Sequence, residues 1–176
     1  MTALEIAHTL TAEEISSCAA KLRSCLPTLV AYPILPSHRT NLIRPKLSFD
    51  STAVALSFLP AADNFTYLHL RSALSHICGE NGVEVIARYA TTSSHITLAR
   101  FVDGTELKDK ETMKKWVEKI EEMNIWLQEK FWDGENPSSH DSTPLQWWIG
   151  AERGLEIRKD DLWYGGGVTI EQGEHF

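Results

Sequence analysis

The sequence has few cysteines, no long hydrophobic run and no excess of basic residues. Its three cysteines, Cys18, Cys25 and Cys78, are an odd number without the spacing of a metal site. We therefore expect free thiols in a reducing compartment and not a disulfide-stabilised secreted domain. No apolar run approaches the roughly 18 residues needed to span a membrane, and no secretory leader is recognisable. The sequence favours a soluble, monomeric protein of the cytoplasm or nucleus.

The charge balance limits the kind of partner. Lys and Arg total 17 against 24 Asp and Glu, so the formal net charge is -7. This charge argues against a protein that wraps long nucleic acid by neutralising phosphates. A nucleotide or an RNA end is still compatible, because a local cleft can be positive on an acidic protein. The 176 residues, 43% of them hydrophobic, predict one globular domain or two closely packed lobes.

Two familiar kinds of site are also missing. Gly165, Gly166 and Gly167 are not followed by Lys-Ser/Thr or by a helix, so they are not a phosphate-binding P-loop. They fit a bulge or a close approach of backbones better. His69 and His76 share one face of a predicted helix, but a metal site there would need a third ligand.

The strongest chemical signal is the stretch from Ser93 to Phe101. In an extended strand His95, Thr97 and Ala99 would share one face, while Ile96 and Leu98 would point to the other. His95 and Thr97 would lie roughly 6 to 7 Å apart, which suits two groups that hold one phosphoryl group. Histidine transfers protons near neutral pH, and threonine donates hydrogen bonds to phosphate oxygens. On composition alone, a structural role is the commoner outcome for such a pair.

The run His95-Ile96-Thr97-Leu98-Ala99-Arg100 resembles the His-x-Thr-x-x-Arg signature of the two-histidine (2H) phosphoesterase superfamily, which includes the LigT-like RNA 2′,3′-cyclic phosphodiesterases. Residues 45–50 and 162–167 also resemble fungal proteins described as RNA ligase/cyclic nucleotide phosphodiesterase-like. The resemblance implies a bilobal α+β fold, with two antiparallel sheets backed by helices around a central cleft. It further implies that two histidines act as general acid and base, that two hydroxyl residues hold the phosphate, and that no metal or other cofactor is needed.

A weak internal repeat bears on the first histidine. Residues 1–5 align with 96–100, so that Thr2 matches Thr97 and the position matching His95 falls directly before Met1. The predicted site therefore contains His95 as catalytic residue and Thr97 and Thr2 as phosphate-binding residues. We expect that the chain is a single bilobal domain that either lacks its N-terminal strand or strands, or is a degenerate relative that no longer needs the pair.

Local patterns predict the elements around this motif. Arg44 and Lys46 are candidates for contact with an anion, although solvated basic residues are commoner beside a hairpin. Trp147, Trp148, Trp163 and Tyr164 are predicted to serve mainly in core packing rather than in stacking a base. The predicted elements are a strand at 1–8, a capped helix at 12–25, a hairpin at 42–60 that turns at Asp50, a helix from Asn64 to Gly79, the motif strand, a long helix from Asp109 or Lys110 to about 131, a surface loop at 133–143, strands at 146–149 and 155–157, and a hairpin at 163–170.

These observations predict a phosphodiesterase that acts on 2′,3′-cyclic phosphates or 2′-5′ linkages of RNA ends or nucleotides. Two alternatives stay open. One is a non-catalytic module that binds a nucleotide or an RNA end with the same fold. The other is a structural interaction protein, in which His95 would be buried or hydrogen-bonded away from any cleft.

Overall fold

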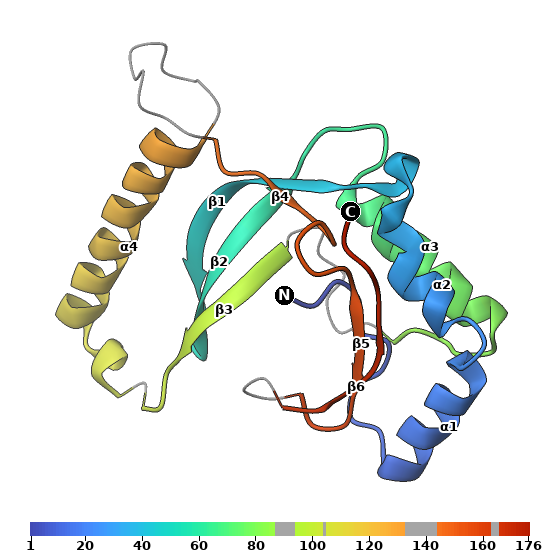
Figure 1. Ribbon diagram of the computed structural model, residues 1–176. Coiled ribbons are helices and arrows are strands. Elements are labelled where there is room, and N and C mark those ends of the chain that lie inside the picture. Colours follow the sequence, from blue (N-terminus) through green and yellow to red (C-terminus); the bar gives the residue numbers. More distant parts are fainter. Residues whose placement is uncertain (87–93, 104, 133–143, 163–165) are drawn as a thin grey trace. The chain divides into compact units, whose positions relative to one another are not determined.

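The structure is a computed structural model that describes residues 1–86, 94–103, 105–132, 144–162 and 166–176. It combines helices with antiparallel sheets, so the predicted α+β class is confirmed (Figure 1). The chain divides into two compact units. Within the described residues, no helix is both long enough and apolar enough to cross a membrane. Unit 1 consists of Met1, Leu42–Pro60 and Ser93–Trp147, and unit 2 consists of Thr2–Asn41, Ala61–Thr92 and Trp148–Phe176.

Unit 1 is built on a sheet whose strands have the order β3-β2-β1-β4. The predicted hairpin is confirmed, because β1 and β2 are antiparallel neighbours joined at Asp50. The Asp50 carboxylate accepts hydrogen bonds from the Thr52 hydroxyl and from the amides of Thr52 and Ala53, which hold its pKa below the ordinary value of 3.8. The strands are β1 (Asn41–Phe49), β2 (Ala53–Pro60), β3 (Ser94–Arg100) and β4 (Trp147–Trp148).

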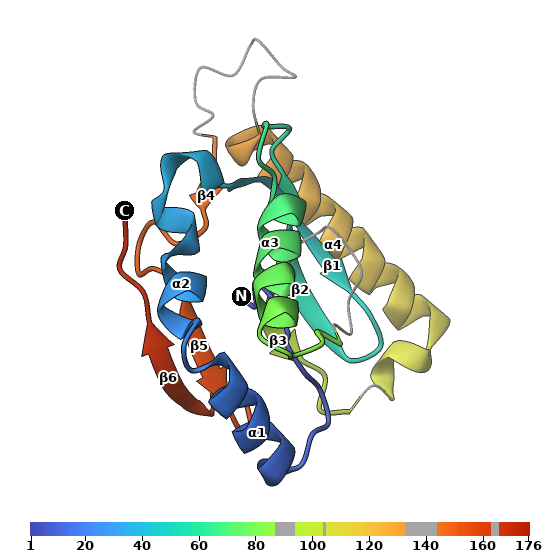
Figure 2. The same cartoon turned by 90° about the vertical axis from the view of Figure 1, so that its right-hand side faces the viewer.

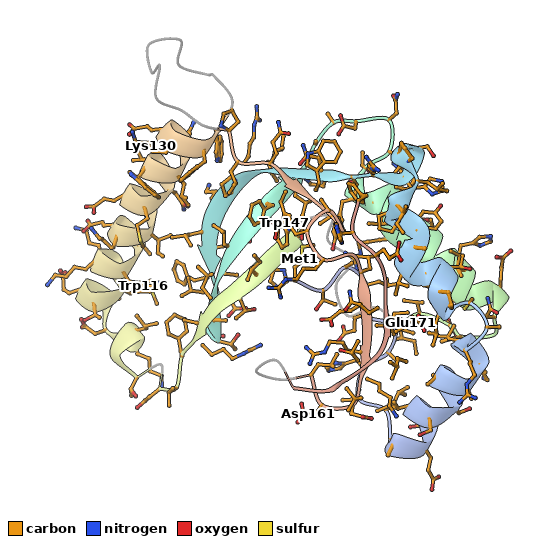
Figure 3. The ribbon with its side chains drawn as sticks, viewed as in Figure 1. Met1, Trp116, Lys130, Trp147, Asp161 and Glu171 are labelled. Carbon is orange, nitrogen blue, oxygen red and sulfur yellow. The ribbon has the colours of Figure 1, made fainter. Side chains whose placement is uncertain are left out.

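A long helix, α4 (Lys110–Phe131), packs against this sheet (Figures 1 and 3). The helix begins at Lys110, one of its two predicted starts, and Asp109 is the N-cap, whose carboxylate accepts a hydrogen bond from the Thr112 amide at 2.9 Å. Trp116 projects toward the sheet, where its ring meets Phe49 and Phe101 edge-on at 5.8 Å between centroids. The apolar stripe of this helix is therefore core, as its period of 3.6 residues indicated. A 3-10 turn, η3 (Glu106–Lys108), precedes the helix.

Hydrogen bonds from α4 also fix the backbone of β1. The Asn124 amide accepts the Leu47 N–H at 2.7 Å and donates to the Leu47 carbonyl at 3.0 Å. Just past the helix, the indole N–H of Trp132 donates to the Pro45 carbonyl at 2.9 Å. These side chains replace the strand neighbour that β1 lacks at these residues, so its polar groups stay paired.

The described residues of unit 2 form three α-helices, two 3-10 turns and a two-stranded sheet. In Figure 2, α2 lies beside β5 and β6, with which it is in contact. Its core includes Leu22, Leu26, Leu29, Val30, Tyr67, Leu70, Leu74, Cys78 and Ile149. Its elements are α1 (Ala12–Leu22), α2 (Leu26–Ala31), two 3-10 turns, η1 (Tyr32–Ile34) and η2 (Pro36–His38), then α3 (Tyr67–Glu80) and the antiparallel strands β5 (Glu156–Lys159) and β6 (Val168–Gln172).

The helix predicted at 12–25 is shorter than expected. The capping box of Thr11 and Glu14 is present, but the helix ends at Leu22 and a second one begins at Leu26. Pro27 was expected to stop a helix and instead lies in the first turn of α2. Proline is tolerated there, because the first N–H groups of a helix have no partner within it. Similarly, α3 begins at Tyr67 with Thr66 as N-cap, and not at Asn64.

The predicted strand at 1–8 is wrong. Residues 1–10 have no regular secondary structure. The Tyr67 hydroxyl donates to the carbonyls of Thr2 and Ala3, both at 3.2 Å, and the Ile86 amide donates to the Ile6 carbonyl. An alternating pattern makes a strand only where a second strand supplies its backbone partners, and here a side chain and a loop supply them.

Candidate functional site

The motif strand β3 lies at one end of the strand order and pairs only with β2 among the described residues. The pairing changes register in the middle of the motif. One residue of β3, Leu98, has no partner in β2, which makes it a β-bulge. The cross-strand partners are His95 with Ser57, Ile96 with Leu56, Thr97 with Ala55, Ala99 with Val54 and Arg100 with Ala53.

The bulge decides which motif residues share a face. Directly opposed residues of neighbouring strands point to the same side of a sheet. His95, Thr97 and Arg100 therefore lie on one face, because their partners alternate regularly along β2. Ala99 was expected beside Thr97, and that prediction is wrong: the extra residue at Leu98 reverses the alternation. Because of the bulge, Arg100 lies on the same face as His95 although it is three residues after Thr97.

Strand β1 extends the same face. Lys46 is opposite Ser57 and Ser48 is opposite Ala55, so a row Lys46–Ser57–His95 runs beside a row Ser48–Ala55–Thr97. The two serine hydroxyls are 2.8 Å apart, which confirms that they lie on the same side. Lys46, Ser48, His95, Thr97 and Arg100 are exposed, whereas Ala55 and Ser57 are half-buried. We call these seven residues the polar face.

The opposite side of the sheet has another composition. The residues between those of the polar face are apolar, and two of them, Val54 and Phe58, are 8% and 3% exposed. Phe49, whose ring touches Trp116 of α4, belongs to this side. We call it the covered face; it consists of Leu47, Phe49, Val54, Leu56, Phe58 and Ile96.

The basic residues near the polar face differ in their surroundings. Arg100 is close enough to Asp50 to help lower the pKa of that carboxyl, after the larger effect of the Thr52 and Ala53 hydrogen bonds. In the part of the chain that the structure describes, no carboxylate lies within ion-pair distance of Lys46. Arg44 has a left-handed backbone with φ of 54°, and its guanidinium lies 5.7 Å from the centre of the Trp132 ring. Of the two basic residues suggested by the sequence, only Lys46 is on the polar face.

Thr2, the second predicted phosphate-binding residue, belongs to unit 2, whereas His95 and Thr97 belong to unit 1. The Thr2 side chain is exposed, and its carbonyl accepts the Tyr67 hydroxyl. Met1, the residue before it, belongs to unit 1, where the buried Ser94 hydroxyl donates to the Met1 sulfur. The use of Thr2 together with His95 and Thr97 on one phosphate stays a prediction.

Ser48 and Ser57 were not singled out from the sequence. The signal was the hairpin itself, because strict alternation through 46–49 and 54–58 separates the polar residues from Leu47, Phe49, Leu56 and Phe58. The sequence alone did not give the register in which β1, β2 and β3 pair. Only the pairing shows that the serines lie beside the histidine and not at the far side of the sheet.

The other candidate residues either contact nearby side chains and backbone or lie outside the described residues. The His69 ring accepts the Thr66 amide, and His76 lies 3.4 Å from Glu80. Among the described residues, no group of three or more His, Cys, Asp or Glu could hold a metal. Trp147 packs on Phe58 at 5.5 Å, as core packing predicts. Trp163, Tyr164, Gly165, the loop at 133–143 and Ser93 lie outside the described residues.

The glycine run makes a close backbone contact at Gly167. Gly167 has a φ of 84°, and an added Cβ would lie 2.7 Å from the Lys159 carbonyl oxygen. This bears out the expected close approach of backbones, which only glycine permits without strain.

Comparisons of the chain with protein-family models, with curated proteins and with solved structures found no significant match. The family resemblance therefore stays a prediction from the sequence.

Proposed function

We propose that this protein is a phosphodiesterase of the two-histidine type that acts on 2′,3′-cyclic phosphates or 2′-5′ linkages of RNA ends or nucleotides. The observation that carries the proposal is the bulged strand β3, which holds His95, Thr97 and Arg100 of the signature on one exposed face. A structural role for His95 would instead require a ring that is buried or hydrogen-bonded away from any cleft.

The chemistry follows from the side chains of that face. His95 is the general acid or base that transfers a proton to or from an oxygen of the scissile phosphodiester. The Thr97 hydroxyl, two residues along the same strand, donates a hydrogen bond to a phosphate oxygen. Oriented donors of this kind stabilise charge that develops on the phosphate in the transition state. Thr2 is proposed as the second hydroxyl.

The division of the chain supports a bilobal, LigT-like arrangement. Each unit has antiparallel strands and helices of its own, which fits two sheets backed by helices. The hypothesis includes a cleft between two such lobes.

A binding module without catalysis is the second candidate, and one observation favours it. Within the three described strands β1 to β3, the polar face carries a single histidine. General acid and general base each contribute roughly a hundred- to ten-thousand-fold, so a site with one of the two would bind its ligand better than it would turn it over.

The test compares His95→Ala with His76→Ala. His76 is a suitable control because its side chain is 75% exposed and lies on α3. Hydrolysis of a 2′,3′-cyclic nucleotide should fall roughly a hundred- to ten-thousand-fold in His95→Ala and stay unchanged in His76→Ala. Both variants should melt at the wild-type temperature. Equal turnover by His95→Ala and wild type would refute catalysis by His95, and binding without turnover in the wild type would favour the binding module.

A further inference from the structure

The polar face is wider than one phosphate. Neighbouring strands are about 4.8 Å apart, so Lys46 and His95, with β2 between them, have Cα atoms about 10 Å apart. Side chains stand roughly perpendicular to a sheet, and their tips keep about this separation. An upright Lys46 on β1 therefore reaches a second anionic group more readily than the phosphoryl group that His95 and Thr97 hold over β3. Successive phosphates of a nucleotide chain are separated by one sugar, and a second phosphate would reach across β2.

The middle of the face can carry such a chain. Ala55, between Ser48 and Thr97, has the shortest side chain of the polar face, so it blocks nothing above β2. In the Ser48–Ser57 pair one hydroxyl donates to the other, which leaves one hydroxyl proton available for a sugar or phosphate oxygen. The row thus offers donors from His95 through Ser57 to Lys46.

Charge distinguishes the two ends of the face. The positive charge of Arg100 acts on the Asp50 carboxylate and helps to lower its pKa. Lys46, by contrast, has no carboxylate within ion-pair distance among the described residues. On a protein of net charge -7, a lysine in this position is a local attraction for an anion. A lysine contacts a phosphate through a compact ammonium group on a flexible stem, and a phosphate contact does not distinguish one base from another.

We propose, on the basis of the proposed function, that the preferred substrate is an RNA end of at least two nucleotides and not a mononucleotide. His95 and Thr97 take the terminal cyclic phosphate, and Lys46 binds the phosphodiester next to it. Lys46 is thus a specificity-determining residue that distinguishes an RNA end from a free nucleotide.

The experiment measures binding of two probes, a 2′,3′-cyclic mononucleotide and a dinucleotide that ends in a 2′,3′-cyclic phosphate. The variants are Lys46→Met, which removes the charge and keeps most of the length, Lys46→Arg, which keeps the charge, and Lys115→Met as control. Lys115 is an exposed lysine of α4. Wild type should prefer the dinucleotide. Lys46→Met should weaken dinucleotide binding roughly five- to tenfold, leave the mononucleotide unchanged, and lower the salt dependence of dinucleotide binding by about 0.7 in log-log slope.

Lys46→Arg should restore the preference, and Lys115→Met should not differ from wild type. The inference is overturned if Lys46→Met weakens both probes equally or weakens neither. His95→Ala separates this result from the function itself, because it should reduce binding of both probes. If His95→Ala binds both probes like wild type, the proposed function fails; if it weakens both while Lys46→Met has no effect, only the role of Lys46 fails.

Discussion

The two faces of the sheet in unit 1 are made by the same strands but differ in composition and exposure. The covered face is apolar and packs on α4, with Phe58 3% exposed, while the polar face carries His95, Thr97 and Lys46 at the surface. Alternation along β2 places Phe58 and Ser57 next to each other in sequence and on opposite faces. The difference indicates that the core and the exposed polar surface of one strand can be changed separately. Four experiments on variants probe the two faces and the contacts that support them.

The largest expected effect is on the covered face. Phe58→Ala should lower the free energy of unfolding by roughly 3 to 5 kcal/mol, because it leaves a cavity beside Trp147. Ser57→Ala, one residue away on the polar face, should change it by less than about 0.5 kcal/mol. Urea unfolding of both variants measures the difference. A similar loss in the two would show that the faces are not distinct.

The next effect concerns the way α4 holds the covered face. Asn124→Ala removes both hydrogen bonds to Leu47 and leaves a part-buried backbone amide unpaired, which should cost about 1 to 3 kcal/mol. Asn124→Asp keeps the acceptor for the Leu47 amide but sets a carboxylate oxygen against the Leu47 carbonyl in place of the donor, so it should be destabilised as well. Equal stability of Asn124→Ala and wild type in urea would mean that water replaces the side chain at no cost.

A smaller effect is expected from deletion of Leu98. In the observed register Leu98 has no partner, so its removal leaves Thr97, Ala99 and Arg100 opposite the same residues of β2. Because Leu98 is 56% exposed, the loss of stability should stay below about 1 kcal/mol. Thermal unfolding tests this, and destabilisation as large as that of Phe58→Ala would contradict the bulge.

The smallest effect is a pH dependence at the start of α4. Hydrogen bonds from the Thr112 amide and hydroxyl hold the pKa of Asp109 below its ordinary 3.8. A depressed folded-state pKa stabilises the protein above about pH 3.8 and loses this effect as the pH falls through the folded value. Asp109→Ser keeps a neutral capping oxygen at every pH. Its unfolding midpoint should therefore depend less on pH between 6 and 2 than that of wild type; identical dependence would rule out this role for Asp109.

The sequence predicted those parts of unit 1 that depend on local signals. The predicted turn at Asp50 is confirmed and is held by side-chain hydrogen bonds to the next amides. The start of α4 at Lys110 was one of two predicted, and the Asp109 cap fixes it. The place of His95 and Thr97 on one face followed from alternation alone. Ala99 was misplaced because a bulge is a property of pairing between strands, which a single strand does not encode.

The N-terminal segment shows the same limit more strongly. Residues 1–8 alternate as well as many strands do, yet their described carbonyl partners are Tyr67 and Ile86. The aligned segment at 96–100 is a strand because β2 pairs with it. The two halves of the suspected repeat therefore differ in local structure, although α1 and α4, which follow them, are both capped as predicted.

The central claim is that the polar face of β3 binds a phosphate, and a crystal structure of the chain with adenosine 2′-monophosphate tests it most directly. We predict phosphate oxygens within about 2.7 to 3.2 Å of the His95 ring and the Thr97 hydroxyl. A nucleotide bound with its phosphate away from β3, with His95 and Thr97 contacting only protein or water, would contradict the account.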